Sequence, residues 1–189
     1  MGLIHLVASG IRDANRAIKQ NNAQKDDTVQ TVVRNTFSID IPSFLTQTTK
    51  YGDYASVQYW NKTLDIALLV IDESKSEFIE SLEELKKDVP NIKDRSILDN
   101  LATMVLDNYF EDINKIQVND YCNTKINGLD AVTFNAFQKR TFFKDALFGS
   151  FAFIEGKETL YQIVILSGGT SISKLAEKMD KSIYSFKEL

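Results

Sequence analysis

The chain has 189 residues, 43% of them apolar and 25% charged, a composition typical of a globular protein with a core of its own. Its formal net charge is −4 and it has no run of basic residues, which argues against nucleic acid as a partner. One cysteine, Cys122, and one histidine, His5, exclude an internal disulfide and most hydrolase and histidine-based metal chemistry.

The first predicted element is an amphipathic helix over residues 3–20. Its apolar residues recur at spacings of three and four: Ile4, Val7, Ile11, Ala14 and Ile18. Residues 21–31 are polar and indicate a linker, so we expect an N-terminal appendage, 1–31, followed by one domain, 32–189. We interpret the helix as a packing or self-association element, with contact to a membrane surface as the alternative.

Targeting signals are absent from the printed sequence. The apolar stretch near the start precedes its arginines, which is the wrong order for a secretory leader. No apolar run reaches the roughly 20 residues that span a bilayer. We therefore expect a chain without a transmembrane segment, cytoplasmic as written, or a cell-envelope protein if a leader precedes this sequence.

An alternating stretch, Phe37-Ser38-Ile39-Asp40-Ile41-Pro42, predicts the first strand of the domain, and Pro42 ends it. Residues 55–60 alternate in the same way. Residues 64–71 are apolar on both faces, so we expect a hairpin across Asn61-Lys62-Thr63 whose second strand is covered on both sides.

Three helices are predicted in the rest of the domain. Apolar spacing indicates helices from Phe78 to Leu85, from Ile97 to Ile113 and from Ile172 to Phe186. Ser96 lies where its hydroxyl group could cap the second of these helices.

Four more strands are expected between the second and third helices, over residues 115–124, 129–137, 142–154 and 159–166. Asn127-Gly128 is a strong signal for a tight turn between the first two. Strands joined by short turns, with helices between and after them, predict an α+β fold with a mostly antiparallel sheet of about six strands covered by helices.

This order of strands and helices resembles the PsbP-like fold over about residues 33–188, and three short stretches add to the resemblance. They are Phe37–Pro42, Ile126-Asn127-Gly128 followed by Asp130-Ala131, and the closing Ile183-Tyr184-Ser185-Phe186-Lys187. The group includes the photosystem II extrinsic protein, bacterial DcrB-like envelope proteins and a small Ran-binding nuclear import factor. The resemblance implies an α/β/α sandwich and a role in binding other proteins or assisting their assembly, and it supplies no catalytic residues and no cofactor.

Carboxylates on the second helix are the strongest metal-like pattern. Asp107, Glu111 and Asp112 fall near one another, and oxygen ligands suit a hard cation such as Ca²⁺. The sequence has no loop like that of an EF-hand, and helical carboxylates at this spacing are usually solvated. We therefore expect no metal and no cofactor.

Aromatic side chains are the candidate binding residues, because aromatic residues dominate the energetics of protein interfaces. The candidates are Trp60, Tyr51, Tyr54, Phe142 and Phe143. Trp60 lies on the opposite face of its predicted strand from Val57 and Tyr59, and we expect it to be partly exposed.

No nucleophile–base pair and no metal cluster is visible, so we assign no catalytic residue. We expect a non-catalytic binding or assembly module that recognises a protein partner. A small-ligand carrier or small enzyme, using carboxylates and tyrosines in a pocket between helix and sheet, is the alternative. Self-association through residues 3–20 is a separate hypothesis about the oligomeric state.

Overall fold

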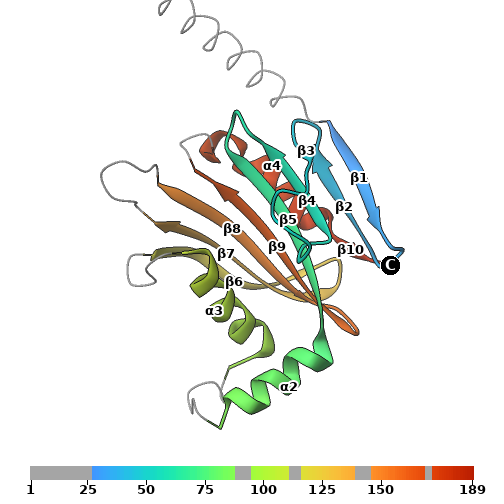
Figure 1. Ribbon diagram of the computed structural model, residues 1–189, viewed down its shortest axis with the longest axis vertical. Helices are drawn as coiled ribbons and strands as arrows, with labels where there is room; N and C mark the ends of the chain where they lie inside the picture. Colours follow the sequence, from blue (N-terminus) through green and yellow to red (C-terminus); the bar gives the residue numbers. More distant parts are fainter. Residues whose placement is uncertain (1–26, 88–94, 111–115, 139–145, 169–171) are drawn as a thin grey trace, which may run out of the picture.

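The structure is a computed structural model that describes residues 27–87, 95–110, 116–138, 146–168 and 172–189. Within these ranges the chain forms two antiparallel sheets and three helices (Figure 1). The strands are β1 (Thr28–Val33), β2 (Phe37–Pro42), β3 (Thr46–Gln47), β4 (Val57–Asn61), β5 (Ile66–Ser74), β6 (Ile116–Ile126), β7 (Leu129–Gln138), β8 (Leu147–Glu155), β9 (Thr159–Ser167) and β10 (Lys187–Glu188). The helices are α2 (Lys75–Leu85), α3 (Ile97–Tyr109) and α4 (Ile172–Ser185).

The larger sheet has seven strands in the order β3-β4-β5-β9-β8-β7-β6, and the smaller sheet has three in the order β1-β2-β10. The α+β architecture and the antiparallel pairing confirm the expectation from the sequence, while the strands outnumber the expected six or so. The predicted strand Phe37–Pro42 is present and lies in the smaller sheet, between β1 and β10. The predicted helix over residues 3–20 lies outside the described residues.

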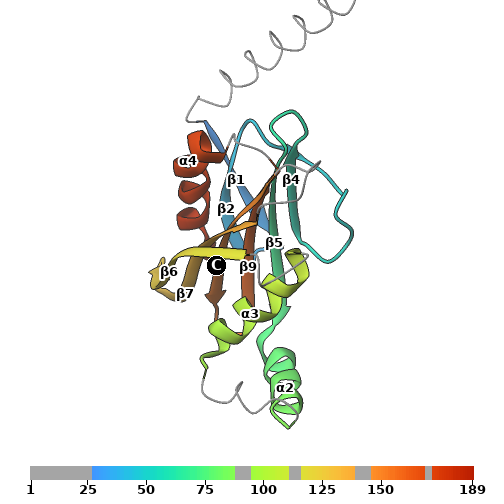
Figure 2. The ribbon, with the colours of Figure 1, turned by 90° about the vertical axis from the view of Figure 1, so that its left-hand side faces the viewer.

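Both faces of the seven-stranded sheet are covered, and each carries its own hydrophobic core. The first core lies between this sheet, the smaller sheet and α4, and includes Phe37, Ile39, Leu68, Ile163 and Met179. The second core lies between the opposite face and helices α2 and α3, and includes Leu69, Phe78, Leu101, Phe151 and Val164. Figure 2 shows α4 and α3 on different sides of the sheet.

β5 is the doubly covered strand that its sequence predicts. It pairs with β4 on one side and with β9 on the other. Leu68 belongs to the first core and the adjacent Leu69 to the second, because successive side chains of a strand point to opposite faces. None of the described helices has both the length and the apolarity needed to cross a bilayer.

Strand pairing begins before the domain boundary expected from the sequence. β1 starts at Thr28, inside the polar stretch 21–31, and pairs along its whole length with β2. The sequence TVQTVV therefore belongs to the folded sheet. Its Thr and Val residues have strong β-propensity, and the apolar partner strand supplies the packing that stabilises them.

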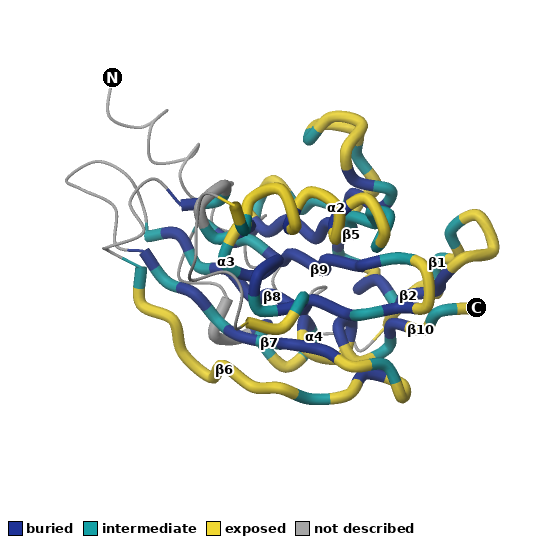
Figure 3. The backbone as a smooth tube through the Cα atoms, turned by 90° about the horizontal axis from the view of Figure 1, so that it is seen from below, coloured by how far each residue is buried: buried dark blue, intermediate teal, exposed yellow. Residues whose placement is uncertain are grey.

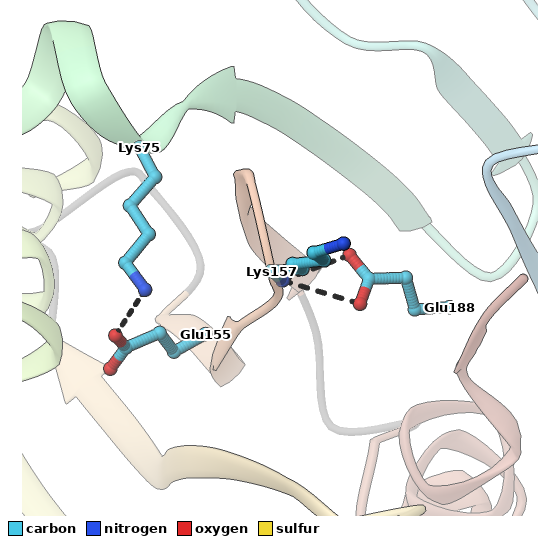
Figure 4. Close-up of polar contacts among 4 residues, drawn as sticks. All are labelled: Lys75, Glu155, Lys157 and Glu188. Carbon is cyan, nitrogen blue, oxygen red and sulfur yellow. Dashed lines mark hydrogen bonds and ion pairs between the residues drawn. The ribbon is translucent and has the colours of Figure 1, made fainter.

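The last residues of the chain are held on the β8–β9 hairpin (Figure 4). The backbone N–H of Lys157 donates to both carboxylate oxygens of Glu188 at 3.3 Å, and the Tyr161 hydroxyl donates to Oε1 at 3.1 Å. A side chain at Gly156 would collide with this carboxylate, so the close approach requires glycine. Beside them Lys75 Nζ lies 2.6 Å from Glu155 Oε1 and links the start of α2 to the end of β8.

Candidate functional site

A nine-residue loop, 48–56, joins β3 to β4 at one edge of the larger sheet. Its turn depends on Gly52, whose φ of +82° lies in the left-handed region that favours glycine. The N–H of Gly52 donates to the carbonyl of Thr49 at 3.3 Å, and the N–H of Lys50 donates to Thr48 Oγ1 at 3.2 Å. The loop is thus closed by its own hydrogen bonds.

The side chain of Gln58 fixes the loop from beneath. Gln58 lies in β4 and is buried. Its Oε1 accepts from the N–H of Tyr51 at 3.1 Å, and its Nε2 donates to the carbonyl of Ala55 at 3.1 Å and to that of Gly52. Both ends of one buried amide are therefore used to hold three points of the loop backbone in place.

The loop places a cation over aromatic rings. Lys50 Nζ lies 3.9 Å from the centroid of the Trp60 ring and 5.5 Å from that of Tyr51, distances at which cation–π attraction acts. Tyr51 and Trp60 are half-buried, while Tyr54 is 54% exposed. We call these four residues, Lys50, Tyr51, Tyr54 and Trp60, the aromatic loop surface.

Tyrosine hydroxyl groups near this surface are held neutral. Burial is the main cause that raises the pKa of Tyr51, with smaller contributions from the nearby Asp65 and Tyr54. Burial also raises the pKa of Tyr109 at the end of α3, and its interaction and hydrogen bond with Tyr54 add to this. These hydroxyl groups are thus hydrogen-bonding groups rather than bases, and the Tyr54–Tyr109 contact ties the loop to α3.

Two open hollows flank the loop and share Gln47 and Thr48. One, of about 450 Å³, is lined by Phe44, Trp60 and the β4–β5 turn. The other, of about 490 Å³, is lined mainly by polar residues, including Arg34, Asp53, Tyr54 and Asp72. Each hollow opens beside the aromatic loop surface, so a partner that contacts Tyr54 or Trp60 could also reach into one of them.

The structure brings together three of the five aromatic candidates chosen from the sequence, Tyr51, Tyr54 and Trp60. Phe142 and Phe143 lie outside the described residues, as do Glu111 and Asp112 and the side chain of Asp107. Within the described ranges no three His, Cys, Asp or Glu side chains are arranged to hold a metal ion.

Sequence reasoning missed Lys50 and Gln58. Gln58 alternates with Val57 and Tyr59, whose side chains belong to the first core, so the alternation does place its side chain on the other face. Nothing local indicates that a loop folds over that face and accepts its hydrogen bonds. The position of Lys50 over Trp60 depends on that loop and has no sequence signal of its own.

The remaining ionisable groups with displaced pKa values are dispersed over the described structure. Burial raises the pKa of Glu73, which lines a groove of about 360 Å³ between α2, α3 and the sheet. Burial, and next the nearby Asp120, raise the pKa of Asp180 in a different hollow, beside α4. None of the described residues lining the helix groove is a tyrosine. The hollow beside α4 is lined by Asp120, Asp180 and Tyr184, so carboxylates and a tyrosine, as the small-enzyme alternative requires, do lie together there.

No protein-family model matches the sequence, and a search of the curated proteins finds no match. Solved structures similar to the chain include cyanobacterial PsbP from Synechocystis, with a TM-score of 0.49 and 8% identity, covering 87% of this chain and 94% of that one. They also include the Ran-binding protein Mog1p of Saccharomyces cerevisiae, with a TM-score of 0.48 and 10% identity over 85% and 95% of the two chains.

A Pseudomonas aeruginosa protein of unknown function is similar as well, with a TM-score of 0.45 and 11% identity over 84% and 94% of the two chains. The comparison returns the PsbP group that the sequence resembles. Identities of 8–11% and TM-scores below 0.5 say nothing about what this chain binds.

Proposed function

We propose that the chain is a non-catalytic binding module that recognises a partner protein through the aromatic loop surface. The observation that carries the proposal is the fixed position of the loop. A buried amide, Gln58, holds the backbone of Tyr51, Gly52 and Ala55, so the loop backbone has little conformational freedom left to lose when a partner binds.

The chemistry of the surface favours a protein partner. Tyrosine and tryptophan combine a large apolar area with one polar atom, which is why they are enriched at interface hot spots. Lys50 adds a charge directly over Trp60, so an acidic side chain of the partner could pair with it beside the ring. The aromatic groups lie around a loop with an open hollow on each side, an arrangement suited to contact with the extended surface of a protein partner.

Capture from an extract of the native cells, followed by mass spectrometry, tests the proposal with Tyr54→Ala as the variant. Tyr184→Ala is the matched control, because Tyr184 is 52% exposed and lies on α4. We expect the wild type and the control to recover the same partner. The affinity of that partner for Tyr54→Ala should be at least about tenfold lower. Equal recovery by all three chains would show that binding does not use this surface.

The variant Gln58→Ala tests whether binding depends on the fixed position of the loop or only on the side chains that the loop presents. This variant keeps all four side chains of the aromatic loop surface and removes the hydrogen bonds beneath them. We expect weaker binding of the same partner, measured by titration calorimetry, with a larger unfavourable entropy of binding. Unchanged affinity in a variant that is still folded by circular dichroism would remove the argument from preorganisation.

A further inference from the structure

The two sheets have four edge strands, and three of these are blunted in ways that prevent pairing with another chain. β3 and β10 are two residues long, and β10 consists of Lys187 and Glu188. β6 is long and exposed (Figure 3), but its register is broken by a bulge between Asn119 and Cys122, where Asp120 has a φ of +56°.

β1 has none of these protections. Its six residues contain no charge, no proline and no bulge, and its register with β2 is continuous. It is the outermost strand of the smaller sheet (Figure 1), and no described segment pairs with its outer edge. Val29 and Val32 are 59% and 53% exposed, so the edge presents apolar side chains together with unpaired backbone groups.

The hydrogen-bond pattern shows which backbone groups are free. The N–H of Ser43 donates to the carbonyl of Asp27 at 2.9 Å just beyond the end of β2. Because bonded and non-bonded residues alternate in an antiparallel pair, the residues of β1 with odd numbers direct their backbone groups to β2. Thr28, Gln30 and Val32 therefore direct theirs to the outer edge.

The side chains of β1 divide between its two faces. Val33 packs against the first core, and Thr31 Oγ1 lies 3.3 Å from the hydroxyl of Tyr59, so the odd-numbered residues face the core. Val29 is on that same face but extends past the covered area. A further strand beside β1 would cover Val29 and satisfy the outward backbone groups at once.

We propose that this strand is β1 of a second copy of the chain, paired antiparallel about a two-fold axis at Thr31. A two-fold axis normal to a sheet keeps each face on one side, so paired residues must both be odd or both even. With Thr31 on the axis, Val29 of one copy lies opposite Val33 of the other, and Gln30 lies opposite Val32.

The charges at the ends of β1 favour this register. The strand ends at Val33, because Arg34 and Asn35 have φ values of +48° and +58°. With Thr31 on the axis, Arg34 of one copy comes opposite Thr28 of the other and one residue along from Asp27, so each end of the strand pair carries one cationic and one anionic residue. An axis at Gln30 would instead set the Asp27 carboxylate opposite Val33, which desolvates a charge without a partner.

Strand addition of this size gives a weak dimer. One strand pair buries much less than the roughly 800 Å² per partner of a standard interface. Sedimentation velocity of the full chain, from micromolar to near-millimolar concentration, should therefore show a reversible monomer–dimer equilibrium. A monomer at every concentration would overturn the proposal.

Two variants and a matched control assign the contact. Val29→Lys directs a charge to the face that the second copy would cover, and Gln30→Pro removes an N–H that points away from β2. Each should weaken the dimer about tenfold or more. Val118→Lys is the control, since Val118 is 42% exposed on the other long edge strand, β6. A dimer that survives both β1 variants and is lost in Ile11→Lys would belong to the predicted helix 3–20 and overturn the proposal.

Cross-linking tests the register directly. In a Cys122→Ser background, Thr31→Cys puts two cysteines opposite each other at the axis, in a non-hydrogen-bonded pair whose short separation suits a disulfide. Under oxidation we expect a covalent dimer from Thr31→Cys and very little from Gln30→Cys. A cross-link at neither position, or through Gln30→Cys alone, would contradict pairing about Thr31.

Discussion

Glu73 is a partly buried carboxylate whose surroundings disfavour its negative charge. It lies near the end of β5 beside Phe78 and Leu101, and burial raises the pKa of its carboxyl group. The side-chain amide of Gln162 donates to Glu73 Oε1 at 2.6 Å and only partly offsets that effect. The folded chain therefore binds a proton at Glu73 more tightly than the unfolded chain does, so ionisation of this group lowers the free energy of unfolding.

Replacement of Glu73 by glutamine should remove this pH-dependent loss of stability. At pH 7 the wild-type carboxylate is charged and Glu73→Gln is expected to be the more stable chain, because the amide can still accept from Gln162. The advantage should shrink as the pH falls through the raised pKa toward the unfolded value of 4.5. Urea unfolding at neutral and acid pH measures it, with Glu80→Gln on α2 as the control for losing one negative charge. A Glu73→Gln chain that is less stable at pH 7 would contradict the argument.

At the scale of single elements, the start of α3 shows how a local sequence fixes a helix boundary. Ser96 Oγ accepts from the N–H of Asp99 at 3.1 Å and donates to the Asp99 carboxylate at 2.6 Å. The hydrogen bond from the Ser96 hydroxyl to the carboxylate, and next that from the Tyr121 hydroxyl, lower the pKa of Asp99. Since Tyr121 stacks on Phe134, the cap also attaches β6 to the second core.

Removal of this cap should cost measurable stability. Ser96→Ala leaves the N–H of Asp99 without its side-chain acceptor, and we expect a loss of about 1 kcal/mol in the free energy of unfolding. Ser81→Ala is the control, because the Ser81 hydroxyl only donates back to the Glu77 carbonyl on the exposed side of α2. Equal losses in the two variants, by urea denaturation, would show that the cap contributes nothing specific.

Elements with a strong local signal are the ones that the sequence predicts. Asn127 and Gly128 have φ values of +48° and +89°, as a tight turn between β6 and β7 requires, and Ser96 caps where its position suggested. The strand β1 was missed because its alternating polar residues read as linker until β2 pairs with it. The loop over Gln58 was missed for a similar reason: contacts between segments, which no local pattern encodes, determine it.

At the scale of the whole molecule, Phe186 connects the two sheets. Its fully buried ring lies 5.4 Å from that of Phe37 in the smaller sheet and 4.8 Å from that of Tyr161 in the larger one. Asn127 at the β6–β7 turn donates to the Phe186 carbonyl at 2.5 Å. The position of Phe186 between the two sheets makes it a shared part of the first core.

Because the sheets share this core, they should unfold together. Phe186→Ala is expected to lower the free energy of unfolding by about 3–5 kcal/mol, the usual cost of a large cavity. Trp60, the single tryptophan, lies in β4 of the larger sheet, where it pairs with Ala67 of β5 and reports on that sheet. We expect its fluorescence transition and the far-UV circular dichroism transition to move to lower urea together. Tyr184→Ala, two residues away and exposed, should shift neither; a Trp60 transition that stays in place in Phe186→Ala would show that the larger sheet unfolds independently.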